Sequence, residues 1–406
     1  MTDETLPPSV DAVTAEAEPL ALAHTINGAS LAGITFKNTL LTILTLGIWS
    51  FWAKTRVRRY LWSNIQIAGD PFQYTGTGFE LFKGAIIALL ILAALFVPLG
   101  ILSTAGYQAI TTPIQFLIFI LLTPLGMFFA RRYRLSRTEW RGIRAGFSGD
   151  WKAFAFKSAG LTLLSILTLG LAAPFRRVFI ERYFWCNSFF GTEKFGTTLQ
   201  VRHIALFFYI AWAVLAAGIL IDFHDFQIVF MNGFYRAQGK PQFADPSNTN
   251  LLISVYSIIL SMIIYIYYRF IYFKISTSNI FLGNIKLTSR LSLWAVVKIT
   301  FIMFLIFSFF CVILTFIGFS FAGAIIISLF KSNSHIAAII LGSVTALTLY
   351  ALIIAIWSWF WTARFIEILV ETTKIEGTLD AATIRQSDLT APNRGEGLLG
   401  AVDIGL

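Results

Sequence analysis

The chain has 406 residues, enough for two or three soluble domains, but its composition excludes a soluble fold. Hydrophobic residues make up 57% of the chain and charged residues only 13%, which leaves too little polar surface for soluble domains. Two cysteines in this length exclude a disulfide scaffold and a cysteine-based zinc or iron–sulfur site. The N-terminus has no basic segment before an apolar core, so no cleavable signal peptide is expected. The composition predicts a polytopic membrane protein.

Six apolar stretches without Lys, Arg, Asp or Glu are long enough to cross a bilayer, which takes about 20 residues. They are 84–106, 111–130, 204–221, 251–268, 299–330 and 336–363. Two further stretches, 38–53 and 158–175, are shorter, and a helix over the first would reach only about 24 Å across a hydrocarbon core of ~30 Å. Gly47 and Gly170 are natural breaks within them. We therefore expect both short stretches to be re-entrant or interfacial.

The distribution of basic residues favours re-entry over crossing. If both short stretches turn back, 28 of the 31 Lys and Arg lie on one side of the membrane, and only Arg236, Lys240 and Lys331 lie on the other. If both cross as ordinary tilted helices, which stays the alternative, the clusters around Arg56 and Arg176 fall on opposite sides. Positive charge is retained in the cytoplasm, so re-entry places both termini and nearly all cations there. The net charge of +10 then requires no nucleic-acid partner.

The chain carries a parallel internal repeat with an offset of 123 residues. LTILTLG at 41–47 recurs as LSILTLG at 164–170. The same offset relates a basic and aromatic motif in the two copies, with Arg59, Tyr60, Trp62 and Asn64 matching Arg182, Tyr183, Trp185 and Asn187. We take Gly47, Gly170 and the matched Arg-Tyr pairs as structural residues of the repeat. Both copies should share one topology.

Short alternating apolar runs around a Gly-containing turn predict β-hairpins. They lie at 64–76, 140–149, 187–196, 279–288 and 372–381, and the N-terminal ALAHTINGAS can donate a further strand. Lone hairpins are only marginally stable in water, so we expect these to pair into one small cytoplasmic β layer.

The predicted fold is mainly α and polytopic. It has about six transmembrane helices, two short re-entrant or interfacial helices, and repeated small cytoplasmic β-hairpins that form a β layer. We divide the chain into a disordered acidic N-terminal tail, three repeat units and a cytoplasmic C-terminal hairpin and tail, with bounds 1–22, 23–134, 135–273, 274–371 and 372–406. The third unit lacks the short LTLG segment.

Several motifs together resemble a known family. They are LLTILTLGIWSFWAKTRVRRYL, the hairpin ending YTGTG, TEWRGIRAGFSG, and the terminal GEGLLGAVDIG. This combination resembles the YjgN-type bacterial inner-membrane proteins, a family of unknown function, from about residue 24 to the C-terminus. The family pattern has an acidic residue and an aromatic where this chain has Ala401-Val402-Asp403. The resemblance implies the bacterial inner membrane and brings no substrate, cofactor or catalytic residue.

No catalytic, cofactor or metal signature stands out in the chain. Asp222, His224 and Asp225 are weak metal candidates, but membrane spans commonly end in such polar residues. Glu396 and Asp403 in the terminal motif can form an acid pair, although docking the tail onto the basic cytoplasmic face explains them more simply. Trp357, Trp359 and Trp361 precede Arg364 and are interpreted as interfacial anchors rather than a ligand-stacking box.

The favoured functional hypothesis is a non-enzymatic membrane scaffold that binds lipid or a protein partner. Its expected partners are membrane lipids with anionic headgroups at the basic cytoplasmic face. The alternative is a transporter or channel for an uncharged or amphipathic solute, suggested by the parallel duplication and the two re-entrant segments. A membrane enzyme that uses Glu396 and Asp403, or the Asp222–Asp225 cluster, ranks third. The six long spans contain no Lys, Arg, Asp or Glu, which argues against a proton- or ion-coupled transporter.

Overall fold

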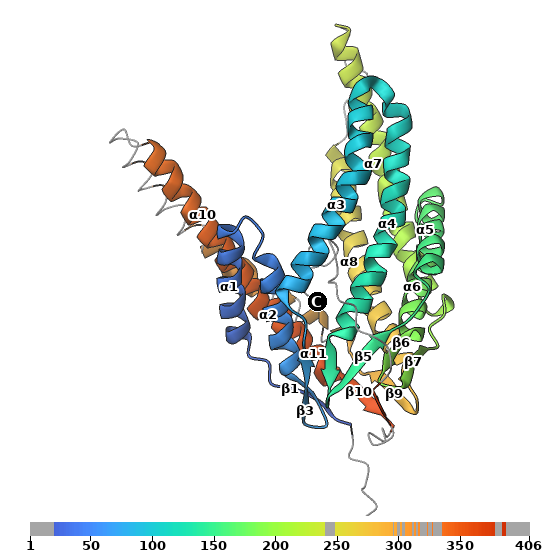
Figure 1. Cartoon of the computed structure of the whole chain (residues 1–406). Helices are drawn as coiled ribbons and strands as arrows, with labels where there is room; N and C mark the ends of the chain where they lie inside the picture. Colours follow the sequence, from blue (N-terminus) through green and yellow to red (C-terminus); the bar gives the residue numbers. More distant parts are fainter. Residues whose placement is uncertain are drawn as a thin grey trace, which may run out of the picture.

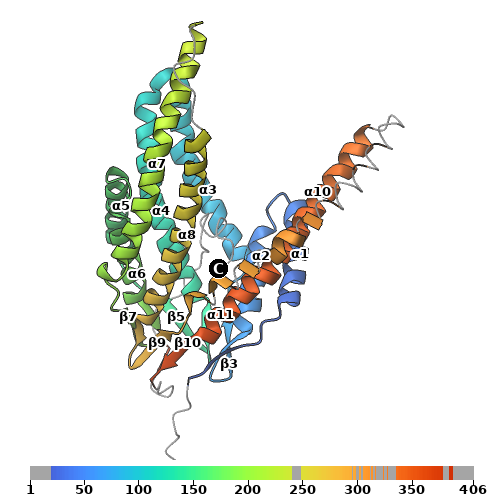
Figure 2. The same ribbon diagram turned by 180° about the vertical axis from the view of Figure 1, so that it is seen from behind.

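The computed structural model describes residues 20–239, 248–294, 335–377 and 384–386, with scattered positions from 296 to 327. Long helices rise from a small sheet at one end and diverge in two groups, which gives the described part a V shape (Figures 1 and 2). The helices are α1 (Gly28–Leu44), α2 (Ser50–Ser63), α3 (Gly78–Leu102), α4 (Gln108–Ser136), α5 (Trp151–Leu167), α6 (Ala173–Cys186), α7 (Arg202–Ala237), α8 (Asn248–Ser278), α10 (His335–Trp357) and α11 (Arg364–Thr372), with two π-helical turns, η1 (Ser103–Tyr107) and η2 (Ser358–Ala363).

The sheet contains ten short strands that follow one another in sequence order. They are β1 (Leu22–His24), β2 (Ile65–Ile67), β3 (Asp70–Tyr74), β4 (Thr138–Trp140), β5 (Ile143–Phe147), β6 (Ser188–Phe190), β7 (Glu193–Thr197), β8 (Ile280–Leu282), β9 (Ile285–Ser289) and β10 (Thr373–Glu376). Every hydrogen-bonded neighbour is antiparallel; Phe72 pairs with Trp140, for example, and Phe195 with Leu282. The terminal strands β1 and β10 also lie against each other, so the sheet is a nearly closed ring.

Four of the five predicted hairpins are confirmed, as β2–β3, β4–β5, β6–β7 and β8–β9, and the predicted N-terminal strand is β1. Only the first strand of the hairpin predicted at 372–381 lies in the described part. This strand, β10, pairs with β9, the last strand of the preceding hairpin, and residues 378–383 lie outside the described part. The hairpin at 372–381 stays a prediction.

The ring is built from five equivalent units, and the fifth is shared by the two ends of the chain. In each unit the residue after the outgoing strand donates its backbone N–H to a carbonyl at the C-terminal end of the helix that leads into the next strand. These bonds are Thr25 to Asn64 (2.9 Å), Thr75 to Arg137 (2.9 Å), Ser148 to Asn187 (3.0 Å), Thr198 to Asn279 (3.0 Å) and Arg290 to Thr372 (2.8 Å). Strand β10 therefore supplies the incoming half of the fifth unit and β1 its outgoing half.

Both LTLG segments form the tips of helical hairpins, α1–α2 and α5–α6. Each tip places a leucine and a glycine in the left-handed region, Leu46 at φ 51° with Gly47 at 92°, and Leu169 at φ 51° with Gly170 at 95°. Thr45 and Thr168 accept hydrogen bonds from the backbone four residues on, at 2.9 and 3.2 Å. The expectation of one short helix per segment is therefore corrected to two helices that start and end beside the ring. Entry of these tips into the membrane stays a prediction.

Two segments of the described part are long and apolar enough to cross a membrane, Gly78–Ser136 and Gly342–Thr372. The first doubles back, because Gly106 has a φ of 99° and breaks the helix between α3 and α4, which run side by side (Figure 1). The predicted spans at 204–221 and 251–268 coincide with parts of α7 and α8, whereas most of 299–330 lies outside the described residues. The count of six spans remains a prediction.

Replacing Gly47 by alanine is expected to lower the free energy of unfolding by about 1–2 kcal/mol, because a Cβ is unfavourable at positive φ. An added Cβ would meet no atom within 4 Å there, so the cost is confined to the backbone. The control is Gly33→Ala in α1, where space is equally open and the backbone is helical; it should be neutral or slightly stabilising. Thermal unfolding of both variants in detergent tests this, and an equal loss in the two would contradict it.

Candidate functional site

The matched tyrosines of the repeat close the base of the two helical hairpins. The Tyr60 hydroxyl donates to the Asn27 carbonyl at 2.8 Å and accepts from the Asn27 N–H at 2.9 Å, and Asn27 caps α1. Likewise, the Tyr183 hydroxyl donates to the carbonyl of Asp150 at 2.8 Å, and Asp150 caps α5. Burial, together with the Asp150 carboxylate, raises the pKa of Tyr183, so the phenol stays protonated and keeps donating. The repeated tyrosine is therefore structural in both copies.

The matched arginines behave differently in the two copies. Arg59 donates to the Gly76 carbonyl at 2.9 Å and anchors the exit of the first hairpin. Arg182 is exposed and makes no equivalent contact among the described residues. The sequence repeat predicted equivalent roles for Arg59 and Arg182 and did not indicate that only Arg59 would make this contact.

Other basic residues at the base are buried against aromatic rings, which the sequence did not reveal. The Arg58 side chain is 1% exposed, donates to the Tyr74 hydroxyl at 3.2 Å and lies 5.8 Å from the centre of that ring. The Arg131 guanidinium lies 4.7 Å from the centre of the Trp185 ring and donates to Ser188 Oγ at 3.4 Å. Such cation–π contacts hold the cations within the protein, so only part of the basic face is free to meet lipid.

A large apolar cavity of about 760 Å³ lies where the two groups of helices diverge. Its walls come from α8, from residues 293–307 and from the segment 357–361. The lining is formed wholly by aliphatic and aromatic residues: Ile263, Ile264, Ile266, Tyr267, Phe270, Leu293, Val296, Val297, Phe301, Phe307, Trp357, Phe360 and Trp361. This volume is in the range of small-molecule sites.

Two tryptophans of the predicted anchor group line this cavity. Trp357 and Trp361 stack with ring centres 5.1 Å apart and planes at 18°. Phe307 and Trp357 both line the cavity, and their rings pack edge to face with centres 5.2 Å apart. Trp359 faces the other way, against Gly28 at the start of α1. The spacing of the three tryptophans could have indicated that two share one face of the helix, but not which helix lies opposite.

Exposed cations occur on two of the segments that line the cavity. Arg269 directly precedes the lining residue Phe270 on α8, and Lys298 directly follows Val297. Both side chains are exposed, and neither lines the cavity.

The remaining predicted site residues are not brought together by the described structure. Asp222, His224 and Asp225 lie in α7, but their side chains are outside the described part, as are Glu396 and Asp403. No group of three or more metal-ligating side chains occurs among the residues described. Cys186 is a free thiol, and Cys311 lies outside the described residues. The metal, acid-pair and tail-docking hypotheses gain no geometric support.

Comparison with known proteins identifies the family. The family model described as "Bacterial protein of unknown function (DUF898)" matches residues 19–309, which is most of the chain. A stretch of 151 residues is 30% identical to Inner membrane protein YjgN of Salmonella typhimurium (strain LT2), covering 36% of each chain. A stretch of 134 residues is 27% identical to Inner membrane protein YjgN of Escherichia coli (strain K12), covering 33% of this chain and 32% of that protein.

These matches span about a third of the length of the curated relatives. Their names place them in the inner membrane, which supports the bacterial inner membrane as the location of this chain. No solved structure matches. The chain belongs to the DUF898 family of bacterial proteins of unknown function.

Proposed function

We propose that this protein is a non-enzymatic, multi-pass inner-membrane protein that holds a lipid in the apolar cavity and presents the ring of hairpins to the cytoplasm as a scaffold. The carrying observation is the cavity of about 760 Å³, which is lined by aliphatic and aromatic residues on segments that also carry exposed cations. An acyl chain matches the lining, and a lipid headgroup matches Arg269 and Lys298.

The tips of the helical hairpins support this orientation in the membrane. Leu44, Leu46, Leu167 and Leu169 are 77%, 95%, 73% and 81% exposed. Leucines this exposed at a helix end are costly in water and favourable in lipid. The ring lies at the opposite end of these hairpins, among the basic clusters, so tip insertion leaves the ring on the positively charged, cytoplasmic side.

The position of the cavity also supports lipid as the occupant. Its lining residues come from both helix groups, which diverge away from the ring (Figure 2), and this placement supports entry of an acyl chain from the side within the membrane. A soluble and polar metabolite would find no hydrogen-bonding partner beyond the Tyr267 hydroxyl and the two indole N–H groups in this lining.

Filling the cavity should remove most of the lipid held within it. Val297 lines the cavity and is 43% exposed, so Val297→Trp can occupy the space without displacing buried side chains. The control is Val344→Trp on α10, where the valine is 53% exposed and does not line the cavity. A phospholipid with a photoreactive acyl chain is incorporated into nanodiscs with the full chain, and the labelled peptides are mapped by mass spectrometry.

The wild type and Val344→Trp should be labelled chiefly within 263–270 and 293–307, and Val297→Trp should lose most of that label. Labelling spread evenly over the lipid-facing helices would contradict the proposal. Equal labelling of the two tryptophan variants within these peptides would do so as well.

A further inference from the structure

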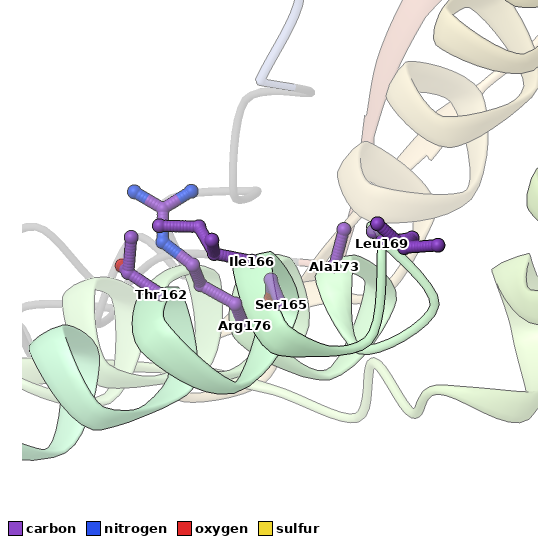
Figure 3. Close-up of a pocket in the computed structure, with 7 residues that line it drawn as sticks. Thr162, Ser165, Ile166, Leu169, Ala173 and Arg176 are labelled. Atoms are coloured by element: carbon purple, nitrogen blue, oxygen red, sulfur yellow. The ribbon is translucent and has the colours of Figure 1, made fainter.

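A second, smaller and open pocket lies along the two helices of the α5–α6 hairpin, separate from the apolar cavity. Its volume is about 350 Å³, and it is lined by Thr162, Ser165, Ile166, Leu169, Gly170, Ala173 and Arg176. Figure 3 shows the Arg176 side chain extending along the pocket toward Thr162 and Ile166. The cavity thus brings one guanidinium and two hydroxyls together just below an apolar tip.

The charge of Arg176 has no counter-ion in the described part of the chain. Its Nε is buried without a hydrogen-bond partner. The Nε of the neighbouring Arg177 also lacks a partner, but the Arg177 guanidinium pairs with Glu181 at 3.6 Å and lies 4.6 Å from the centre of the Tyr272 ring.

Arg176 stands at about the height of cations on other helices. Eleven residues separate it from Asn187, where α6 ends at the ring, so it stands about 16 Å above the ring at a helical rise of 1.5 Å per residue. Lys54 on α2 and Arg269 on α8 stand ten residues before Asn64 and Asn279, at nearly the same height. With the hairpin tips inserted in lipid, a phosphate at this height can neutralise Arg176.

The two hydroxyls define what else the ligand should carry. Thr162 donates to the Ser158 carbonyl at 2.8 Å, and Ser165 donates to the Leu161 carbonyl at 2.7 Å. Their protons are therefore used by the helix, and their oxygens remain as acceptors. A ligand with a hydroxyl beside its anionic group can satisfy these oxygens while the guanidinium binds the anion.

The first repeat supplies an internal comparison. The offset of 123 residues matches Thr162 and Ser165 with Thr39 and Thr42, but Arg176 with Ala53. The first hairpin thus has the hydroxyls without the cation. A charge at this position is present only in the second copy, so it is not needed to form the helical hairpin.

We propose that Arg176, Thr162 and Ser165 form a subsite for the phosphate of an anionic phospholipid whose headgroup carries a hydroxyl, such as a glycerol headgroup. The guanidinium binds the phosphate, and the threonine and serine oxygens accept from the headgroup hydroxyl. The acyl chains continue along the apolar tip formed by Ile166 and Leu169. This site does not depend on the apolar cavity of the proposed function.

The test uses the full chain in phosphatidylcholine nanodiscs that contain a minority of phosphatidylglycerol, with bound lipid counted by native mass spectrometry. Arg176→Gln should weaken phosphatidylglycerol retention about tenfold, the loss expected for a charge-assisted bond. Lys157→Gln removes an exposed cation from the same hairpin, outside the cavity, and should leave retention unchanged. Thr162→Val should reduce the preference for phosphatidylglycerol over phosphatidic acid, which lacks the hydroxyl.

Retention by Arg176→Gln equal to the wild type would overturn the proposal, as would an equal loss in Lys157→Gln.

Glycerol phosphate added in detergent distinguishes the source of the phosphate. Binding of that soluble anion without any preference for the lipid would overturn the assignment to a phospholipid. The same comparison is also made in the Val297→Trp background, in which the apolar cavity is filled. Arg176→Gln should still weaken phosphatidylglycerol retention about tenfold there, so the outcome does not depend on the proposed function.

Discussion

Replacing Glu80 by alanine should lower the free energy of unfolding by about 3 kcal/mol, because three contacts at the base of the α3–α4 hairpin are lost together. The Glu80 carboxylate accepts from the Tyr133 hydroxyl at 2.7 Å and from the Arg137 guanidinium at 2.7 Å. It also completes the capping box with Thr77 that starts α3.

Burial makes these contacts costly to remove. The Tyr133 ring is 1% exposed, and the side chains of Arg137 and Glu80 are 18% and 25% exposed. Alanine would leave the tyrosine hydroxyl without its carboxylate in a site with little access to water. The loss should appear as a large drop in the thermal unfolding temperature, with α3 and α4 the first helices to exchange amide hydrogen.

The matched control for this variant is Glu371→Ala. Glu371 is 67% exposed and lies 3.5 Å from the imidazole of His24, so its removal should cost below about 1 kcal/mol. Glu80→Gln should fall between the two, because it keeps an acceptor for Tyr133 but loses the charge. A Glu80→Ala variant as stable as Glu371→Ala would show that the base of this hairpin is held by other contacts.

Local patterns predicted much of this fold. Alternation around a Gly-containing turn found four hairpins, because the strands of each lie within ten residues of one another. The LTLG repeat located both hairpin tips, since Gly47 and Gly170 are where a helix can reverse. These features depend on neighbours in sequence.

Contacts between distant residues could not be predicted in the same way. Closure of the ring joins β1 to β10 across almost the whole chain, and no local pattern specifies that partner. Arg58 and Arg176 belong to clusters that the sequence marks only as basic. Their burial depends on Tyr74 in one case and on the packing of α5 against α6 in the other. The count of charges therefore predicted on which side of the membrane the basic residues lie. It did not predict which of them are buried in the protein and which are exposed.

Replacing Ile384 by alanine should destabilise the ring by about 3 kcal/mol, the usual cost of truncating a well-packed core isoleucine. Ile384 is 6% exposed and packs in one cluster with Trp140, Phe190 and Leu282, which come from three different hairpins. The short segment 384–386 is thus held on the ring by the side chains of strands that are far apart in sequence.

Two further contacts fix the same segment and supply independent variants. Gln386 accepts from the Arg144 backbone N–H at 2.8 Å. Gly191 has a φ of 56°, and an added Cβ there would lie 2.4 Å from the Arg385 carbonyl oxygen. Gly191→Ala should therefore release the segment without changing Ile384, whereas Gln386→Ala should cost only about 1 kcal/mol.

Tryptophan fluorescence gives a direct measurement, because Trp140 lies in the cluster and should become more solvated when Ile384 leaves it. Ile384→Ala and Gly191→Ala should shift the emission in the same direction and speed amide exchange in β4, β6 and β8 together. Exchange that rises in only one of these strands would mean that each hairpin is stable by itself. Faster exchange in all three would establish that a segment beyond the last strand holds the ring together, and would make the ring, rather than the hairpin, the folding unit on the proposed cytoplasmic face.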